Sequence, residues 1–190
     1  MSSPLRTEAA GAIHHVWARG AVKQTIFLDD ADRRRYLKYF ARVIRLLLWR
    51  PLGYCLMGNH VHLLIETPEP NLGKGMHRLH GAYAQTFNRR HGKSGHVFDR
   101  RYGANRVESD VELWVIASYI AANPVVAGLC ATPEAWPWSS HASVSRHRPD
   151  PCVDKARLAA YFGSMGGDPL DRYLQYVSAN TKARLNGQAV

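Results

Sequence analysis

The sequence has few cysteines and no long apolar segment. Cys55, Cys130 and Cys152 are odd in number and widely spaced, so they suggest neither a disulfide framework nor a CxxC motif, and a reduced, cytoplasmic compartment fits them best. The longest apolar stretch, residues 43–49, is interrupted by an arginine and is far too short to span a bilayer, so no membrane partner is expected. Residues 1–15 lack the apolar centre of a signal peptide, and secretion is not expected.

Acidic residues are also scarce, and the basic excess is unevenly distributed. The chain of 190 residues has 25 Lys and Arg against 15 Asp and Glu, a formal charge of +10, and 46% of it is hydrophobic. This composition argues against wholesale disorder, and the length fits one domain, or one domain with an appendage. Residues 71–107 hold eight basic residues and one acidic residue, Asp99, a balance of +7, whereas the rest of the chain carries +3. Such a segment fits a polyphosphate partner such as nucleic acid, with a solubilising surface as the alternative.

The order of predicted elements between residues 13 and 107 is β-α-β-β-α-β. Apolar alternation and turn residues predict strands, and apolar residues at spacings of three and four predict helices. The strands are expected at 13–19, 53–57, 60–66 and within 96–107, and the helices from Asp29 to Pro51 and over 72–91. This order predicts an α+β protein with a ferredoxin-like core and an antiparallel sheet.

A further helix is expected over residues 109–123. Ser109 and Glu112 form a capping box at its start, and Pro124 is expected to end it. Two short helices near 154–162 and 168–179 would form a small C-terminal extension. The expected organisation is a disordered lead (1–11), a main domain (12–130), a connector with helices (131–180) and a frayed tail (181–190).

Four polar side chains form a candidate metal and nucleophile site. His60 and His62 are two residues apart on a predicted strand, so both imidazoles lie on one face and could chelate a divalent cation. Tyr119 and Asn123 are four apart on a predicted helix and share a face. An amide oxygen suits a hard cation, and a phenol beside that cation could attack a phosphate. The alternatives are a surface histidine pair, a half-buried helical tyrosine and a simple C-cap.

Two other histidine pairs compete with this site. His77 and His80 are three apart on the second helix, but no carboxylate lies near them in sequence, so a phosphate contact or solvation fits them better. His14 and His15 face opposite ways on the first strand, and one of them could neighbour the site across the sheet. The chain has no Walker loop, GxGxxG, GxSxG or HExxH motif.

The motifs resemble those of a known enzyme group. Residues 53–66, GYCLMGNHVHLLIE, resemble the HUH motif of small single-strand tyrosine transposases, and residues 119–129, YIAANPVVAGL, resemble the catalytic-helix signature of the REP-associated tyrosine transposases. The resemblance covers residues 11–162. Gly58 departs from it, because the family usually has proline before Asn-His, which should alter the turn and not the ligands. Three shorter stretches fit the same pattern: 15–20, 83–88 and 138–140.

The resemblance implies a ferredoxin-like core followed by a catalytic helix, and a metal-dependent DNA endonuclease and strand transferase. If the roles of the matching positions in the family's motifs apply here, His60, His62 and Asn123 would bind a divalent metal, Mg²⁺ or Mn²⁺. Tyr119 would attack the scissile phosphate, forming a 5′-phosphotyrosine link and leaving a free 3′-hydroxyl. The implied partner is single-stranded DNA with palindromic hairpins of REP type, and the implied location is the bacterial nucleoid. A monomer is favoured over a dimer.

The basic segment, residues 71–107, is the predicted DNA-binding surface and is expected to bind the hairpin beside the cleavage site. Two other function classes remain: a domesticated protein that binds structured DNA or RNA without cutting, and a metal-dependent hydrolase that uses water. The combined set of two histidines, a tyrosine and an asparagine favours the transferase, because a binder does not require it and a hydrolase needs no tyrosine. The residues assigned to DNA binding are Arg78, Arg89, Arg90, Lys93, Arg100, Arg101 and Arg106.

Overall fold

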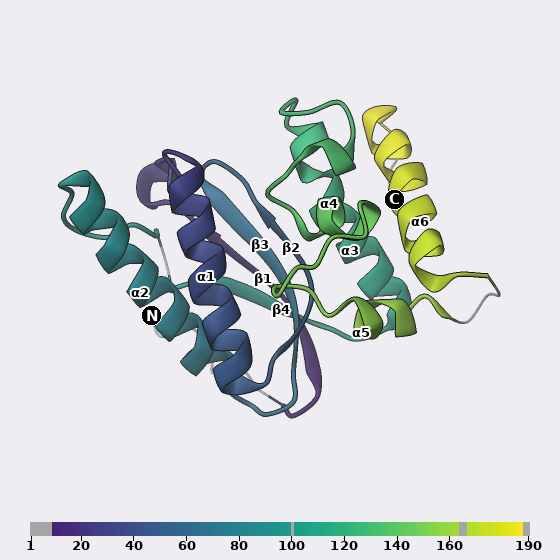
Figure 1. The fold of residues 1–190 in the computed structure, drawn as a ribbon, viewed down its shortest axis with the longest axis horizontal. Helices are drawn as coiled ribbons and strands as arrows, with labels where there is room; N and C mark the ends of the chain where they lie inside the picture. Colours follow the sequence, from purple (N-terminus) through teal and green to yellow (C-terminus); the bar gives the residue numbers. More distant parts are fainter. Residues whose placement is uncertain (1–8, 100, 164–166, 188–190) are drawn as a thin grey trace.

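A four-stranded antiparallel sheet lies between two layers of helices (Figure 1). The computed structural model describes residues 9–99, 101–163 and 167–187. The sheet has the order β2-β3-β1-β4, which is the ferredoxin-like arrangement expected from the sequence, and the predicted fold class is confirmed. The strands are β1 (Ala12–Arg19), β2 (Arg50–Leu56), β3 (His60–Thr67) and β4 (Gly103–Val107).

The helices divide between the two faces of the sheet (Figure 1). One layer consists of α1 (Asp30–Leu47) and α2 (Leu72–His91). The other face is covered by α3 (Asp110–Val126), α4 (Ser140–Ser145), α5 (Lys155–Ala160) and α6 (Pro169–Leu185). Two short 3₁₀ turns, η1 (Ala21–Lys23) and η2 (Pro133–Ala135), complete the described structure. No helix within the described ranges is long and apolar enough to cross a membrane.

Strand alternation determines which side chains each layer receives. Val61 and Leu63 of β3 are fully buried against α1 and α2, whereas His60 and His62 lie on the opposite face, towards α3. The prediction that these two histidines share a face is therefore confirmed. The core beneath α1 and α2 is rich in aromatic rings, which include Tyr36, Phe40, Tyr83 and Phe87.

Helix α3 is apolar around most of its circumference because it is covered on two sides. Its buried residues pack in one core with the sheet, and the same core continues into α6 through Tyr173 and Val177. Ser109 caps α3 by accepting a hydrogen bond from the backbone N–H of Glu112 at 3.2 Å, as predicted. The Glu112 carboxylate reaches back to the N–H of Glu108 at 2.8 Å, one residue before the expected partner.

Two helix ends differ from the expectation. Helix α1 ends at Leu47, because Leu48 adopts the left-handed conformation with φ 54° and lets β2 begin before the proline. Helix α3 continues through Pro124 to Val126. A proline in the last turn removes only one helical hydrogen bond, and burial of Pro124 in the core offsets that loss.

The termini differ as well. The expected frayed tail is wrong for residues 181–185, which form the last turns of α6, with Thr181 buried and its hydroxyl donating to the carbonyl of Val177 at 2.8 Å. At the other end, the N–H of Gly11 donates to the carbonyl of Thr67 at 2.8 Å, so the ordered sheet region begins just before β1. The remainder of the expected lead, residues 1–8, lies outside the described residues.

Candidate active site

Three histidines lie together on the sheet face that α3 covers. His60 and His62 come from β3, with their ring centroids 5.1 Å apart and perpendicular. His15 comes from the neighbouring strand β1, and its Nε2 lies 3.1 Å from the Nδ1 of His62. The register of β1 against β3 places Trp17 opposite His62 and Arg19 opposite His60. The suggestion that one histidine of the first strand neighbours the site is therefore confirmed, and that residue is His15.

Helix α3 brings Tyr119 onto the same cluster. The Tyr119 ring meets the His62 ring edge-on at a centroid distance of 5.4 Å and the His15 ring at 6.0 Å. The tyrosine is half-buried, so it packs against the sheet while part of it stays accessible. The structure thus joins two motifs that are more than fifty residues apart in sequence.

Burial keeps the histidines uncharged. It lowers the pKa of His62 to about 3, with smaller contributions from the nearby His15 and His60. Burial also lowers the pKa of His15 to about 4, and burial together with the positive charge of Arg19 lowers the pKa of His60. Neutral imidazoles have a free ring lone pair, which is the form that binds a metal.

The donor set fits a divalent cation. The Nδ1 of His60 lies 2.7 Å from the Oδ1 of Asn59, so this nitrogen donates and Nε2 keeps its lone pair. If the Nδ1 of His62 donates to His15, the Nε2 of His62 is likewise left as an acceptor. Metal-binding histidines commonly donate their second ring nitrogen to such a partner. Two imidazoles leave coordination positions for an amide, water or phosphate oxygen, so the nitrogen and oxygen donors together could complete the shell of a divalent cation.

Asn123, the third expected ligand, lies one turn beyond Tyr119 on α3. Its Nδ2 donates to the Tyr119 carbonyl at 2.8 Å, so the amide oxygen of Asn123 takes no part in this hydrogen bond. Within the described ranges, no hydrogen bond joins Asn123 to either histidine, and no group of three His, Cys, Asp or Glu residues could hold a metal. The role of Asn123 stays a prediction.

The competing pair His77 and His80 is not a chelate. His77 is exposed, whereas His80 is buried between α1 and α2. The Nδ1 of His80 donates to the carbonyl of Arg101 at 3.2 Å, and its Nε2 lies 3.2 Å from the Tyr36 hydroxyl. Its ring stacks on Phe98 at a centroid distance of 4.1 Å. His80 is therefore a core residue with both nitrogens satisfied.

Sequence reasoning missed three side chains around the site. Arg184 of α6 places its guanidinium carbon 5.0 Å from the centroid of the Tyr119 ring. Arg19 lies opposite His60, as described above. The Trp17 indole covers Gly103, where an added Cβ would lie 2.1 Å from the ring. A signal for Arg184 existed in the helical spacing of Tyr173, Val177, Thr181 and Arg184, but the tail was expected to fray.

The predicted DNA-binding residues have different surroundings. Arg90 forms ion pairs of 2.5 Å with Asp29 and Asp32, so it joins the end of α2 to the start of α1. Arg106 lies 3.5 Å from Glu108. Arg100 lies outside the described residues. The remaining predicted contacts are exposed at the surface: Arg78, Arg89, Lys93 and Arg101.

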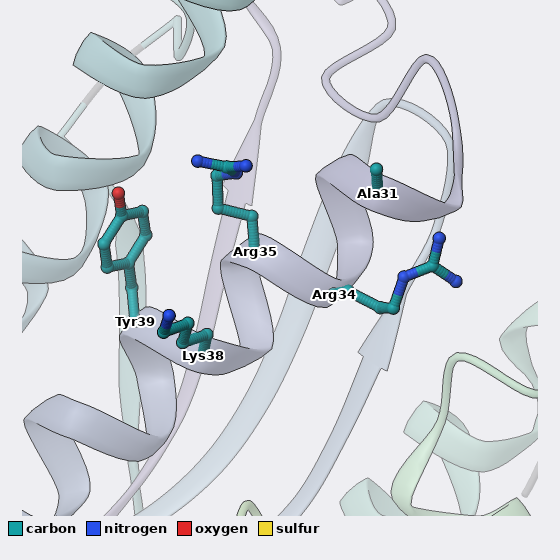
Figure 2. Close-up of a pocket in the computed structure, with 5 residues that line it drawn as sticks. All are labelled: Ala31, Arg34, Arg35, Lys38 and Tyr39. Carbon is teal, nitrogen blue, oxygen red and sulfur yellow. The ribbon is translucent and has the colours of Figure 1, made fainter.

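A second basic surface lies on α1, in the layer on the other side of the sheet from Tyr119. Arg34, Arg35 and Lys38 line a hollow of about 320 Å³ together with Ala31 and Tyr39. Figure 2 shows Arg34 and Arg35 pointing in different directions from the helix. This hollow offers positive charge to an anion, and the residues that line it include neither a carboxylate nor a histidine.

Comparison with known proteins gives a family match and a structure of the same fold. A family model described as "Transposase IS200 like" matches residues 9–123, more than half of the chain. A solved structure of a REP-associated tyrosine transposase bound to a REP hairpin superposes with a TM-score of 0.64 at 17% identity, over 81% of this chain and 92% of that one. At this identity the likeness shows a shared fold. No curated protein matches the chain.

Proposed function

Because the chain belongs to the family of IS200-like transposases, we propose that it is a metal-dependent single-stranded DNA endonuclease and strand transferase. Its substrate would be DNA with palindromic hairpins of REP type, and cleavage would proceed through a 5′-phosphotyrosine intermediate. One observation carries the proposal: the Tyr119 ring of α3 meets the His62 ring of β3 at a centroid distance of 5.4 Å, on the sheet face that α3 covers. A pure binding protein does not need a phenol packed against paired imidazoles.

Tyr119 is the nucleophile of the proposed reaction. Its hydroxyl oxygen forms a bond to phosphorus while the bond from phosphorus to the 3′ oxygen breaks. The phenolic proton passes to solvent, and the departing 3′ oxygen takes a proton from water. The phosphotyrosine link is itself a phosphodiester, so its bond energy is conserved. A 3′-hydroxyl on another strand end can therefore attack it and reverse the reaction. No nucleotide cofactor is needed.

The histidines hold the site ready for a cation. His60 and His62 would bind it through their Nε2 atoms, while Asn59 and His15 fix the orientation of the two rings. Asn123 would contribute its amide oxygen from α3. When bound, Mg²⁺ or Mn²⁺ would polarise the phosphate and stabilise its developing negative charge. The chain itself supplies the nucleophile and the fixed geometry.

The DNA partner is inferred from charge and from the solved relative. Exposed Arg78, Arg89, Lys93 and Arg101 supply cations that could contact a phosphate backbone. The superposed transposase, which shares the fold, is bound to a REP hairpin. We extend this substrate class to the present chain, as a monomer acting in the bacterial nucleoid.

The test is adduct formation on a hairpin-tailed single strand labelled on the 5′-phosphate side of the cut, with Mg²⁺ or Mn²⁺. Wild-type protein should give a protein-linked band on a denaturing gel, and Tyr119→Phe should give none while it still binds the DNA. A half-buried tyrosine elsewhere, Tyr39→Phe, is the matched control.

Each alternative function gives a different result. Binding without any cleavage by the wild type would indicate a domesticated binder. Cleavage without a protein-linked band, unaffected by Tyr119→Phe, would indicate a hydrolase that uses water. Either result would overturn the proposal.

A further inference from the structure

Helix α6 packs alongside α3 (Figure 1). Tyr173, Val177 and Thr181 are buried at helical spacing along it. Arg184 is the next position of the same stripe. Arg184 therefore lies at the interface with α3 rather than in open solvent, at a position where an apolar residue would be expected.

The guanidinium of Arg184 lies over the face of the Tyr119 ring, with its central carbon 5.0 Å from the ring centroid. Its Nε is shielded from solvent and has no hydrogen-bond partner among the described residues. Within the same ranges, no carboxylate forms an ion pair with Arg184. The tip of the guanidinium likewise donates no hydrogen bond within the described residues and is not shielded, so it is an unpaired donor that an acceptor from outside the protein chain can reach. A cation–π contact with a tyrosine does not satisfy that donor.

We propose that Arg184 is a catalytic residue that donates hydrogen bonds to a non-bridging oxygen of the scissile phosphate as Tyr119 attacks it. This inference rests on the proposed function. In the proposed reaction the scissile phosphate brings negative charge next to Tyr119, and the unpaired N–H groups at the tip of Arg184, whose guanidinium lies over the Tyr119 ring, would donate to it. The C-terminal helix is then part of the active site.

The chemistry suits an arginine. Negative charge builds on the non-bridging oxygens as the tyrosine oxygen bonds to phosphorus and the 3′ oxygen departs. A guanidinium stays charged throughout and offers several donors in a fixed plane, which matches two oxygens of a phosphate. Packing of α6 against α3 fixes this donor before the substrate arrives, which is the condition for electrostatic stabilisation of a transition state.

The first measurement is the rate of adduct formation by Arg184→Gln and Arg184→Lys. Loss of one such donor typically slows a reaction by about 10²–10³-fold. Arg184→Gln should show a loss of this size, and Arg184→Lys should recover part of it. Lys182→Gln, which removes an exposed charge from the same helix, is the matched control and should react at the wild-type rate.

A second measurement separates catalysis from a structural role. A methylphosphonate at the cleavage site replaces one non-bridging oxygen with a methyl group and removes its charge. With the diastereomer that lacks the oxygen contacted by Arg184, wild type and Arg184→Gln should differ by less than about tenfold. If the variant is impaired equally on both substrates, Arg184 only holds α6 in place and the inference is wrong.

The outcomes also separate this inference from the proposed function. Absence of any adduct with the wild type would overturn the proposed function. An adduct that Arg184→Gln forms as fast as the wild type would overturn the role of Arg184 alone.

Discussion

The Nε2 of His15 lies 3.1 Å from the Nδ1 of His62, and this bond joins two adjacent strands beneath Tyr119, the proposed nucleophile. It couples a residue outside the HVH motif to a proposed metal ligand within it. A histidine that must present Nε2 as an acceptor carries its proton on Nδ1, and that proton needs a partner. His15 supplies the partner.

The first prediction concerns this pair. His15→Phe keeps a ring at the position and removes the acceptor, so the His62 ring loses its orientation. Loss of such a partner typically weakens metal binding by about 10–100-fold. The concentration of Mn²⁺ that gives half-maximal cleavage should rise by this factor, while hairpin binding without metal stays unchanged. His77→Phe is the control on an exposed histidine. An unchanged metal requirement in His15→Phe would show that the pair does not serve a cation.

The second prediction separates two neighbouring arginines. Arg89 is exposed and has no ion pair within the described ranges, whereas Arg90 is paired with Asp29 and with the buried carboxylate of Asp32. Arg89→Gln combined with Arg101→Gln should weaken hairpin binding and reduce the slope of log affinity against log salt by about one to two. The thermal midpoint should not move. An unchanged slope would assign these cations to a solubilising surface.

Arg90→Gln should give the opposite pattern. It removes both ion pairs and leaves the buried Asp32 carboxylate with one charged partner fewer, which lowers the thermal midpoint. The salt dependence of DNA binding should change little. If the salt slope changes strongly and stability does not fall, Arg90 contacts DNA instead of stabilising the fold. Thermal melts and binding titrations on the same preparations measure both quantities.

A third prediction concerns the packing of Trp17 on β4. An alanine Cβ at Gly103 would lie 2.1 Å from the Trp17 indole, so the ring would have to move. Gly103→Ala should reduce the free energy of unfolding by about 1–3 kcal/mol. In a Trp17→Ala background the same change should cost nearly nothing, because the clash is gone. Gly81→Ala, where the new Cβ meets nothing within 4 Å, is the control and should stabilise α2 by about 0.4–1 kcal/mol. Equal losses in both backgrounds would rule out the clash.

The fourth prediction concerns acid stability. Burial lowers the pKa of His80 to about 4, against about 6.5 in the unfolded chain. The unfolded state therefore binds a proton first as the pH falls, and stability is lost from about pH 6.5 down to about pH 4. This difference corresponds to about 3 kcal/mol. His80→Gln, whose amide can bond both Tyr36 and the Arg101 carbonyl, should lose less stability over that window.

His77→Gln serves as the control for this effect, because His77 is exposed on the same helix. Its stability should depend on pH as the wild type does. An NMR titration of the wild type gives a direct check that needs no variant. If the His80 ring protonates near pH 6.5, the predicted contribution is absent.

Local signals predicted most of the fold, because they depend on neighbours in sequence. Period-two alternation placed His60 and His62 on one face, and the residues 72–91 were predicted as the helix that α2 forms. The rule that proline ends a helix failed at Pro124 because the residue lies in the last turn, where only one hydrogen bond is lost. The Asn-Gly pair at 186–187 was an available stop signal for α6, and Gly187 takes φ 72° there.

Contacts between residues that are distant in sequence could not be predicted from local patterns. Asp29 and Arg90 are 61 positions apart, and a count of charges does not reveal which arginines are engaged in ion pairs. The approach of Arg184 to Tyr119 depends on how α6 crosses α3, which is set by packing of the whole layer. The division of the chain at residue 130 stays a prediction, although residues on both sides of it share the core beneath α6.

Helix α3 is enclosed between the sheet and α6, and this placement limits how two copies of the chain can cooperate. For Tyr119 of one copy to serve the histidines of another, α3 would have to leave a core that also holds α6, which would expose Tyr173 and Val177. Each chain is therefore expected to cut in cis. A mixture of Tyr119→Phe and His62→Ala proteins should remain as inactive as either variant alone, and in a cell carrying both alleles neither would complement the other.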